Sequence, residues 1–307
     1  MQNPGAPAAR ALLVPAAVAV TVVAWASAFV AIRAVGEDLS PGALALGRLL
    51  VGTAVLGVLA VGRGWVAPTR REWGLLAVCG VGWFAVYNVT LNAAEQHLDA
   101  GTTSLLANVG PLLIAVLAGV WLGEGFPRWL LAGIAVSFAG VLLIGLATRR
   151  GDADVIGVVF CLVAAAGYAI GVVAQKVVLR RLPALQVTLT ACAIGAVCCL
   201  PWAGVLAREA DEAPLSSVLG MVYLGAVPTA IAFSTWAYAL ARSDAGRLGV
   251  TTYLVPPLVI GMAWVLLDEV PPALAVVGGV VCLAGVAVSR RRDRPRADVP
   301  QEAGVPG

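Results

Sequence analysis

The block from Ala100 to Leu143 occurs twice in this chain, the second time 145 residues later and without a gap. Pro111 returns as Pro256, Glu124 as Glu269 and Gly133 as Gly278. Because this offset is close to half of the 307-residue chain, the repeat indicates two copies of one unit. Any fold for the chain must therefore contain two similar halves.

The composition indicates that lipid, rather than water, surrounds most of the chain. Hydrophobic residues make up 60% and charged residues 12%, with a mean hydropathy of +0.93, whereas soluble domains carry about 25% charged residues. The six cysteines lie in apolar runs without metal or redox spacing, and His97 is the single histidine. We therefore expect no metal, no cofactor and no enzymatic activity. Apart from the C-terminal tail, no basic patch suggests nucleic acid binding.

Ten segments are apolar over about 20 residues, the length that crosses the hydrocarbon core as a helix. They are 11–34, 42–62, 74–94, 101–122, 128–147, 155–177, 184–206, 216–240, 245–267 and 271–289. The sequence predicts an all-α integral membrane protein with ten transmembrane helices. The predicted parts are an N-terminal segment 1–10, a first five-helix repeat 11–147, a second five-helix repeat 155–289 and a basic, disordered tail 290–307.

The positions of Lys and Arg predict the orientation in the membrane. Fifteen of the 20 basic residues fall on the side of the N-terminus, a bias typical of the cytoplasmic face, and the opposite loops are acidic. We expect a multi-pass protein of the cell membrane with both termini in the cytoplasm. Five spans in each half would make the two repeats inverted. The alternative is a signal peptide ending near Ala26-Ser27-Ala28, which would leave nine spans.

The duplicated blocks resemble the drug/metabolite transporter superfamily, and within it the ten-helix EamA-type members. The first block supplies Ala100-Gly101-Thr102-Thr103-Ser104-Leu105-Leu106, Asn108, Pro111-Leu112 and Leu122-Gly123-Glu124. The second supplies Tyr238-Ala239-Leu240, Ala245-Gly246, Tyr253, Pro256 and Leu267-Asp268-Glu269. Near the N-terminus, Trp25-Ala26-Ser27-Ala28-Phe29 is similar to the family's Trp-Gly-Ser-X-Phe. The resemblance covers about residues 12–289 and implies secondary transport, often export, of amino acids, drugs or other small metabolites.

Proline residues near the middle of the predicted spans are candidate helix breaks or hinges. Each one removes a helix hydrogen bond and frees a backbone carbonyl. Broken helices commonly line the substrate cavity of a transporter, although a plain kink is the alternative. The candidates are Pro111, Pro228, Pro256 and Pro257.

Arg48 is the outstanding charge within a predicted span. It either anchors a substrate carboxylate or phosphate, or is a structural arginine that snorkels or pairs with Glu95 or with carbonyls. We expect polar and aromatic side chains to line the same cavity, with helix–helix hydrogen bonding as the alternative. These candidates are Trp25, Ser27, Tyr87, Asn88, Asn108, Tyr168, Trp236, Thr252 and Tyr253.

Other charged and aromatic residues are expected to face lipid headgroups. Trp83, Trp121, Trp129 and Trp202 are predicted to be interfacial anchors, and Arg33 and Lys176 to snorkel.

A carrier for a small metabolite, working by alternating access and moving its substrate outward, accounts best for these features. A membrane receptor or scaffold that binds a small ligand without moving it is the alternative, and an integral membrane enzyme is a weaker one. No acidic residue lies at mid-depth in a span, so the coupling ion stays open, with protons at Glu95 as one candidate. The substrate and the choice between monomer and homodimer also stay open.

Overall fold

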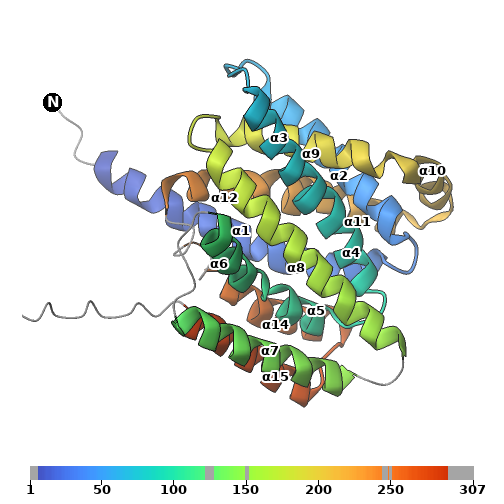
Figure 1. Ribbon diagram of the computed structural model, residues 1–307. Coiled ribbons are helices and arrows are strands. Elements are labelled where there is room, and N and C mark those ends of the chain that lie inside the picture. The colour runs from blue at the N-terminus through green and yellow to red at the C-terminus, as the bar shows by residue number, and fades with distance from the viewer. Residues whose placement is uncertain (1–5, 122–127, 149–151, 244–247, 249–250, 290–307) are drawn as a thin grey trace, which may run out of the picture.

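The computed structural model describes residues 6–121, 128–148, 152–243, 248 and 251–289 (Figure 1). Regular secondary structure in these ranges is helical throughout. Six helical segments are long and apolar enough to cross a membrane, and four shorter apolar helices accompany them. The prediction of an all-α membrane protein is confirmed, while the count of ten spans stays a prediction. Glu124 and the tail from residue 290 lie outside the described residues.

The helices of the two halves follow one another in the same order. The first half holds α1 (Ala6–Val35), α2 (Pro41–Ala60), α3 (Arg70–Cys79), the π-helix η1 (Gly80–Val86), α4 (Tyr87–Ala94), α5 (Ala100–Ala107), α6 (Gly110–Trp121) and α7 (Arg128–Thr148). The second holds α8 (Asp152–Val178), α9 (Ala184–Cys199), η2 (Leu200–Trp202), α10 (Ala203–Glu212), α11 (Leu215–Leu224), the π-helix η3 (Gly225–Ile231), α12 (Ala232–Arg242), η4 (Thr252–Leu254), α14 (Val255–Leu267) and α15 (Ala273–Ser289).

The sequence repeat is also a repeat of helix geometry. Elements α3 and α11, η1 and η3, and α6 and α14 each begin 145 residues apart. The π-helices are the most telling pair, because this wide helix is rare. The same local backbone has therefore formed twice from sequences that differ at most positions.

Each half is completed by the first helix of the other half. Helix α1 packs against α11, α12 and α14 of the second half, whereas α8 packs against α3, α4 and α6 of the first (Figure 1). The two halves are thus interlocked rather than side by side. Residues from both halves meet in the middle of the bundle.

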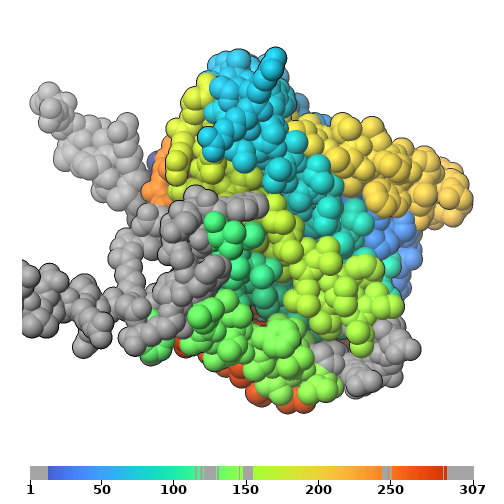
Figure 2. All heavy atoms as spheres, in the orientation of Figure 1, coloured from blue at the N-terminus to red at the C-terminus, as the bar shows by residue number. Residues whose placement is uncertain are grey.

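Helices α7 and α15 form a closely packed pair at one edge of the molecule (Figures 1 and 2). A Cβ atom on Gly140 would lie 2.5 Å from the Gly278 carbonyl oxygen, and one on Gly285 would lie 2.3 Å from Ser137 Oγ. The Ser137 hydroxyl donates to the Cys282 carbonyl at 3.0 Å. Since lipid is as apolar as these side chains, close backbone contact is what holds such a pair together.

We expect Gly140→Ala to lower the thermal stability of the purified protein, because backbone rather than a flexible side chain occupies the space of the new Cβ. Gly261→Ala is the matched control, since a Cβ there meets nothing within 4 Å and alanine favours helix by about 1 kcal/mol over glycine. Thermal unfolding in detergent measures both. Equal melting temperatures for the two variants would contradict the packing described for α7 and α15.

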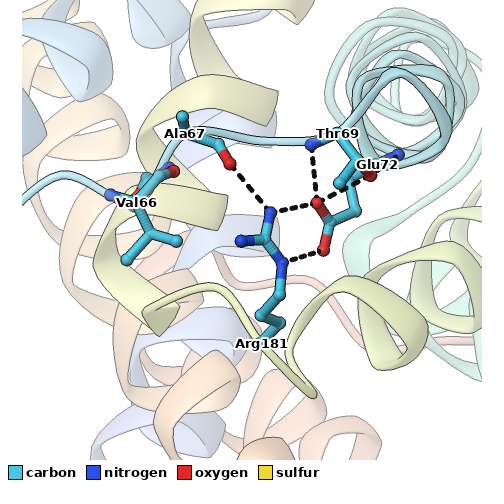
Figure 3. Close-up of polar contacts among 6 residues, drawn as sticks. Val66, Ala67, Thr69, Glu72 and Arg181 are labelled. Carbon is cyan, nitrogen blue, oxygen red and sulfur yellow. Dashed lines mark hydrogen bonds and ion pairs between the residues drawn. The ribbon is translucent and has the colours of Figure 1, made fainter.

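The bundle has two ends, which we name after a residue in each. The Glu95 end holds the segments 36–40, 95–99 and 268–272, and the Arg181 end holds 61–69 and 179–183. At the Arg181 end, the Arg181 guanidinium lies between two acceptors (Figure 3). It donates to Glu72 Oε1 at 2.7 Å and to the Ala67 carbonyl at 2.8 Å, and it also contacts Glu72 Oε2. These bonds join the α2–α3 loop and the first turn of α3 to the second half.

The Glu95 end is held by a different set of polar contacts. Arg33 Nε forms an ion pair with Glu269 Oε1 at 2.7 Å, and Arg33 Nη1 donates to the Glu95 carbonyl at 3.0 Å. The expectation that Arg33 snorkels stays a prediction. Lys176, the other residue expected to snorkel, also has protein acceptors, since its ammonium donates to the carbonyls of Leu240 and Ser243 at 2.8 and 3.0 Å. In both cases protein acceptors lie within reach of the charge.

Candidate functional site

A central cavity of about 60 Å³ lies between the two ends of the bundle. This volume has room for a few water molecules. A larger solute would require the walls to move apart. The lining residues come from both halves of the chain and are Trp25, Ala28, Phe29, Ile32, Arg48, Trp83, Tyr87, Leu91, Ala107, Asn108, Pro111, Tyr168, Phe233, Thr252 and Val255.

Helix breaks bring backbone and polar side chains to this cavity. Helix α5 ends at Ala107 and α6 begins at Gly110, directly before Pro111, which has no N–H to continue the helix. Asn108 lies in the gap and donates from Nδ2 to the Ser104 carbonyl at 3.0 Å. In the second half, η4 occupies the matching place and Pro256 lies in the first turn of α14.

The π-helix η1 carries the cavity-lining Trp83, and η3 carries Thr229, which accepts a hydrogen bond from Arg48. A π-turn leaves carbonyls without the usual helical donor, and a polar side chain satisfies one in each half. Asn88 Nδ2 donates to the Phe84 carbonyl at 2.7 Å, and Thr229 Oγ1 donates to the Leu224 carbonyl at 2.8 Å. Pro228 lies inside η3, where the backbone already departs from α-helical bonding.

Arg48 supplies the positive charge of the cavity and is only 3% exposed. Its Nε donates to Thr229 Oγ1 at 3.2 Å, while its Nη1 is buried without a hydrogen-bond partner in the described structure. No hydrogen bond or ion pair joins it to the Glu95 carboxylate among the described contacts. A buried guanidinium with unused donors is a strong site for a carboxylate or another planar anion.

Aromatic rings form the wall of the cavity. The Trp83 ring centroid lies 5.1 Å from that of Tyr168, 4.8 Å from that of Phe233 and 6.2 Å from that of Trp25. Such faces accept apolar groups and, through cation–π attraction, an ammonium group. Together with Arg48, they make a pocket with one anion-binding side and one apolar side.

Several residues singled out from the sequence meet at this cavity. They are Trp25, Arg48, Tyr87, Asn108, Pro111, Tyr168 and Thr252.

Four others do not line it in this conformation. Ser27 shares a 2.6 Å hydrogen bond with the Tyr223 hydroxyl, and Asn88 is occupied by the Phe84 carbonyl. Trp236 lies beside Trp25, with ring centroids 5.0 Å apart, and Tyr253 packs against Leu112. Of the proline candidates, Pro228, Pro256 and Pro257 also stay out of the lining.

Trp83 is the main lining residue that the sequence analysis placed wrongly. It is 1% exposed and lies at the cavity instead of the membrane interface. The apolar helical segment runs from Arg70 to Ala94, so Trp83 falls near its middle, and depth counted from Arg70 would have revealed this. Phe29, Ile32, Leu91 and Phe233 were also missed, because an apolar side chain in an apolar span gives no distinguishing signal.

The described residues contain no group of three or more His, Cys, Asp and Glu side chains that could hold a metal ion. Of the acidic side chains at the helix ends, Glu72 is bonded by Arg181 and Glu269 by Arg33.

Comparison with known proteins identifies the family. The model of the EamA-like transporter family matches residues 13–146 and again 155–291. A probable terminal-alkyne amino-acid exporter of Streptantibioticus cattleyicolor is 37% identical over 95% of this chain and 97% of its own length. The uncharacterized transporter YdfC of Bacillus subtilis is 33% identical over 85% and 86%.

More distant similarity extends to another named exporter and to a solved fold. A probable amino-acid metabolite efflux pump of Salmonella typhimurium is 26% identical over 87% of this chain and 91% of its own. One crystal structure superposes with a TM-score of 0.62 at 22% identity, covering 90% of this chain and 97% of its own. With two family matches that together span most of its length, the chain belongs to the EamA-like transporter family.

Proposed function

We propose that this protein exports a small zwitterionic metabolite, of the class of amino acids with an apolar side chain, through the central cavity. The observation that carries the proposal is the buried, incompletely paired Arg48 facing an aromatic wall. The substrate carboxylate would bind Arg48, and the ammonium and apolar groups would pack on the rings of Trp25, Trp83 and Tyr168. The names of two relatives, an amino-acid exporter and an amino-acid metabolite efflux pump, agree with this class.

The proposed mechanism is alternating access between two inverted five-helix repeats. The geometric repeat at 145 residues and the exchange of α1 and α8 support it, because two equivalent halves can exchange conformations to open either end. The cavity of about 60 Å³ is too small for such a solute, so loading requires its walls to move apart. Substrate entry would separate the helices that carry the aromatic wall.

We further propose that the Arg181 end faces the cytoplasm and the Glu95 end faces outward. Most Lys and Arg residues fall on the side of the Arg181 end, whereas Glu37, Asp38, Glu95 and Asp99 lie at the other. Export then means loading with the Arg181 end open and release through the Glu95 end.

Flux measurements in proteoliposomes test the proposed substrate class. Phenylalanine is compared with phenethylamine, which keeps the ring and the amine but lacks the carboxylate. We expect saturable flux of the amino acid and at least tenfold weaker apparent affinity for the amine, because the amine cannot use Arg48. Equal transport of phenylalanine and phenethylamine would contradict the proposal. Transport of sugars or inorganic anions without transport of either compound would also contradict it.

A further inference from the structure

Glu95 is a buried carboxyl without a hydrogen-bond donor. Its residue is 2% exposed, and both Oε1 and Oε2 lack a partner in the described structure. The nearby Arg33 does not supply one, because its Nε is directed to Glu269 and its Nη1 to the backbone carbonyl of Glu95. Burying a charged carboxylate in this way is very unfavourable, and such groups take up a proton instead.

The charges around Glu95 lead to the same conclusion. The titratable and charged groups that face it come from α1, α2, α4, the start of α5, α8 and the segment after α14. They are Arg33, Arg48, Tyr87, Asp99, Cys161 and Glu269. Two cations and two other carboxylates already balance, so an ionised Glu95 would leave one uncompensated negative charge at a buried position.

Glu95 also occupies a place where its charge can influence opening. It lies just past the end of α4, one turn beyond the cavity-lining Leu91, and Arg33 directly follows the cavity-lining Ile32. The ion pair between Arg33 and Glu269 connects α1 to the segment after α14 across the Glu95 end. Opening this end would separate those elements and admit water to the Glu95 carboxyl.

We propose that Glu95 is a proton-binding site that couples closure of the Glu95 end to the uptake of one proton. When the end opens, water solvates the carboxylate and the proton leaves. When it closes, the carboxyl must be neutral. With the orientation proposed above, on which this consequence rests, the proton enters from outside as the empty carrier closes and returns to the outside when that end reopens, so a low external pH favours closure of the Glu95 end.

The pH dependence follows from the difference between the two states. Burial raises the pKa of Glu95 well above its usual value in the closed arrangement, whereas a solvated Glu titrates near 4.3. The closed state therefore binds the proton more strongly and is favoured at low pH. This preference is lost as the pH rises toward the pKa of the buried carboxyl.

Infrared spectroscopy of the purified protein in nanodiscs tests the proton site itself, whether or not a substrate is known. We expect the C=O stretch of a protonated carboxyl at neutral pH that disappears in Glu95→Gln and persists in Glu269→Gln. If Glu95→Gln does not fold, Glu95→Asp should shift the band rather than remove it. A wild-type spectrum with no band that depends on Glu95 would overturn the proposal.

Cysteine accessibility tests the link to closure. In a Cys198→Ser background, which removes the exposed cysteine, Ile32→Cys reports entry of a membrane-impermeant thiol reagent through the Glu95 end. The exposed control Glu37→Cys identifies the side on which that end lies. We expect labelling of Ile32→Cys to increase several-fold as the pH rises, and to stay low and independent of pH when Glu95→Gln is added. If labelling of Ile32→Cys does not depend on pH in protein that still carries Glu95, the proposed coupling is wrong. If the infrared band and the pH-dependent labelling are both observed but no amino-acid flux is measured, the result counts against the proposed function instead.

Discussion

Replacing Arg48 with methionine is expected to weaken the apparent affinity for an amino-acid substrate by about 10- to 100-fold without lowering the stability of the protein. Hydrogen bonds to charged groups contribute about 1.5–3 kcal/mol, and each 1.4 kcal/mol is a factor of ten in binding. Stability should not fall, because Arg48 is a buried and incompletely paired charge, and an apolar residue of similar length can replace such a charge at little cost or with a gain.

Two further variants separate this role from a structural one. Thr229→Val removes the acceptor of the 3.2 Å bond from Arg48 Nε while keeping the charge, so it should reduce affinity less than Arg48→Met. Arg48→Lys keeps the charge without the planar fork and should fall between them. Proteoliposome flux and thermal unfolding are measured for each. If Arg48→Met unfolds at a clearly lower temperature and transports with unchanged affinity, Arg48 is a structural residue.

Replacing Trp83 with alanine is expected to destabilise the protein by about 3–5 kcal/mol, the usual cost of truncating a large buried aromatic side chain. Trp83 is 1% exposed and its ring contacts those of Trp25, Phe84, Tyr168, Phe233 and Trp236. The lost contacts are dispersion contacts within the bundle, which lipid does not replace at a position that is buried from it. The enlarged cavity should also accept bulkier substrates.

Trp73→Ala is the matched control, since Trp73 lies on α3 of the same segment and is 46% exposed. We expect it to change the melting temperature by a small fraction of the effect of Trp83→Ala. Trp83→Phe should keep most of the stability because an aromatic ring still fills the site. A Trp83→Ala protein as stable as Trp73→Ala, with unchanged substrate preference, would show that Trp83 is not part of the cavity wall.

Much of the fold could be predicted because its main determinants are encoded in the sequence at long range. The offset between Pro111 and Pro256 is visible without any structure, and the structure reproduces it in the starts of α6 and α14. The apolar runs identified the chain as a membrane protein, because a lipid-exposed helix must be apolar over most of its length. Arg48 could be singled out because a charge inside such a run has few explanations.

The rest depended on side-chain contacts that sequence spacing does not specify. Tyr253 and Asn108 occupy corresponding positions of the two repeats, yet Asn108 lines the cavity and Tyr253 packs against Leu112, because the two breaks differ in local helix geometry. Arg33 forms an ion pair with Glu269, 236 residues away in the chain. Nothing local to either residue indicates that partner.

Counterflow in proteoliposomes tests most directly whether two halves move about a shared central pocket. Vesicles are loaded with a high concentration of unlabelled phenylalanine, diluted, and given a trace of labelled phenylalanine outside. A carrier that alternates between its two open states must exchange the two pools, so we predict a transient accumulation of label above equilibrium, weakened in Arg48→Met. Binding of phenylalanine by the purified protein without any accumulation of label would contradict the account and indicate a receptor that does not move its ligand.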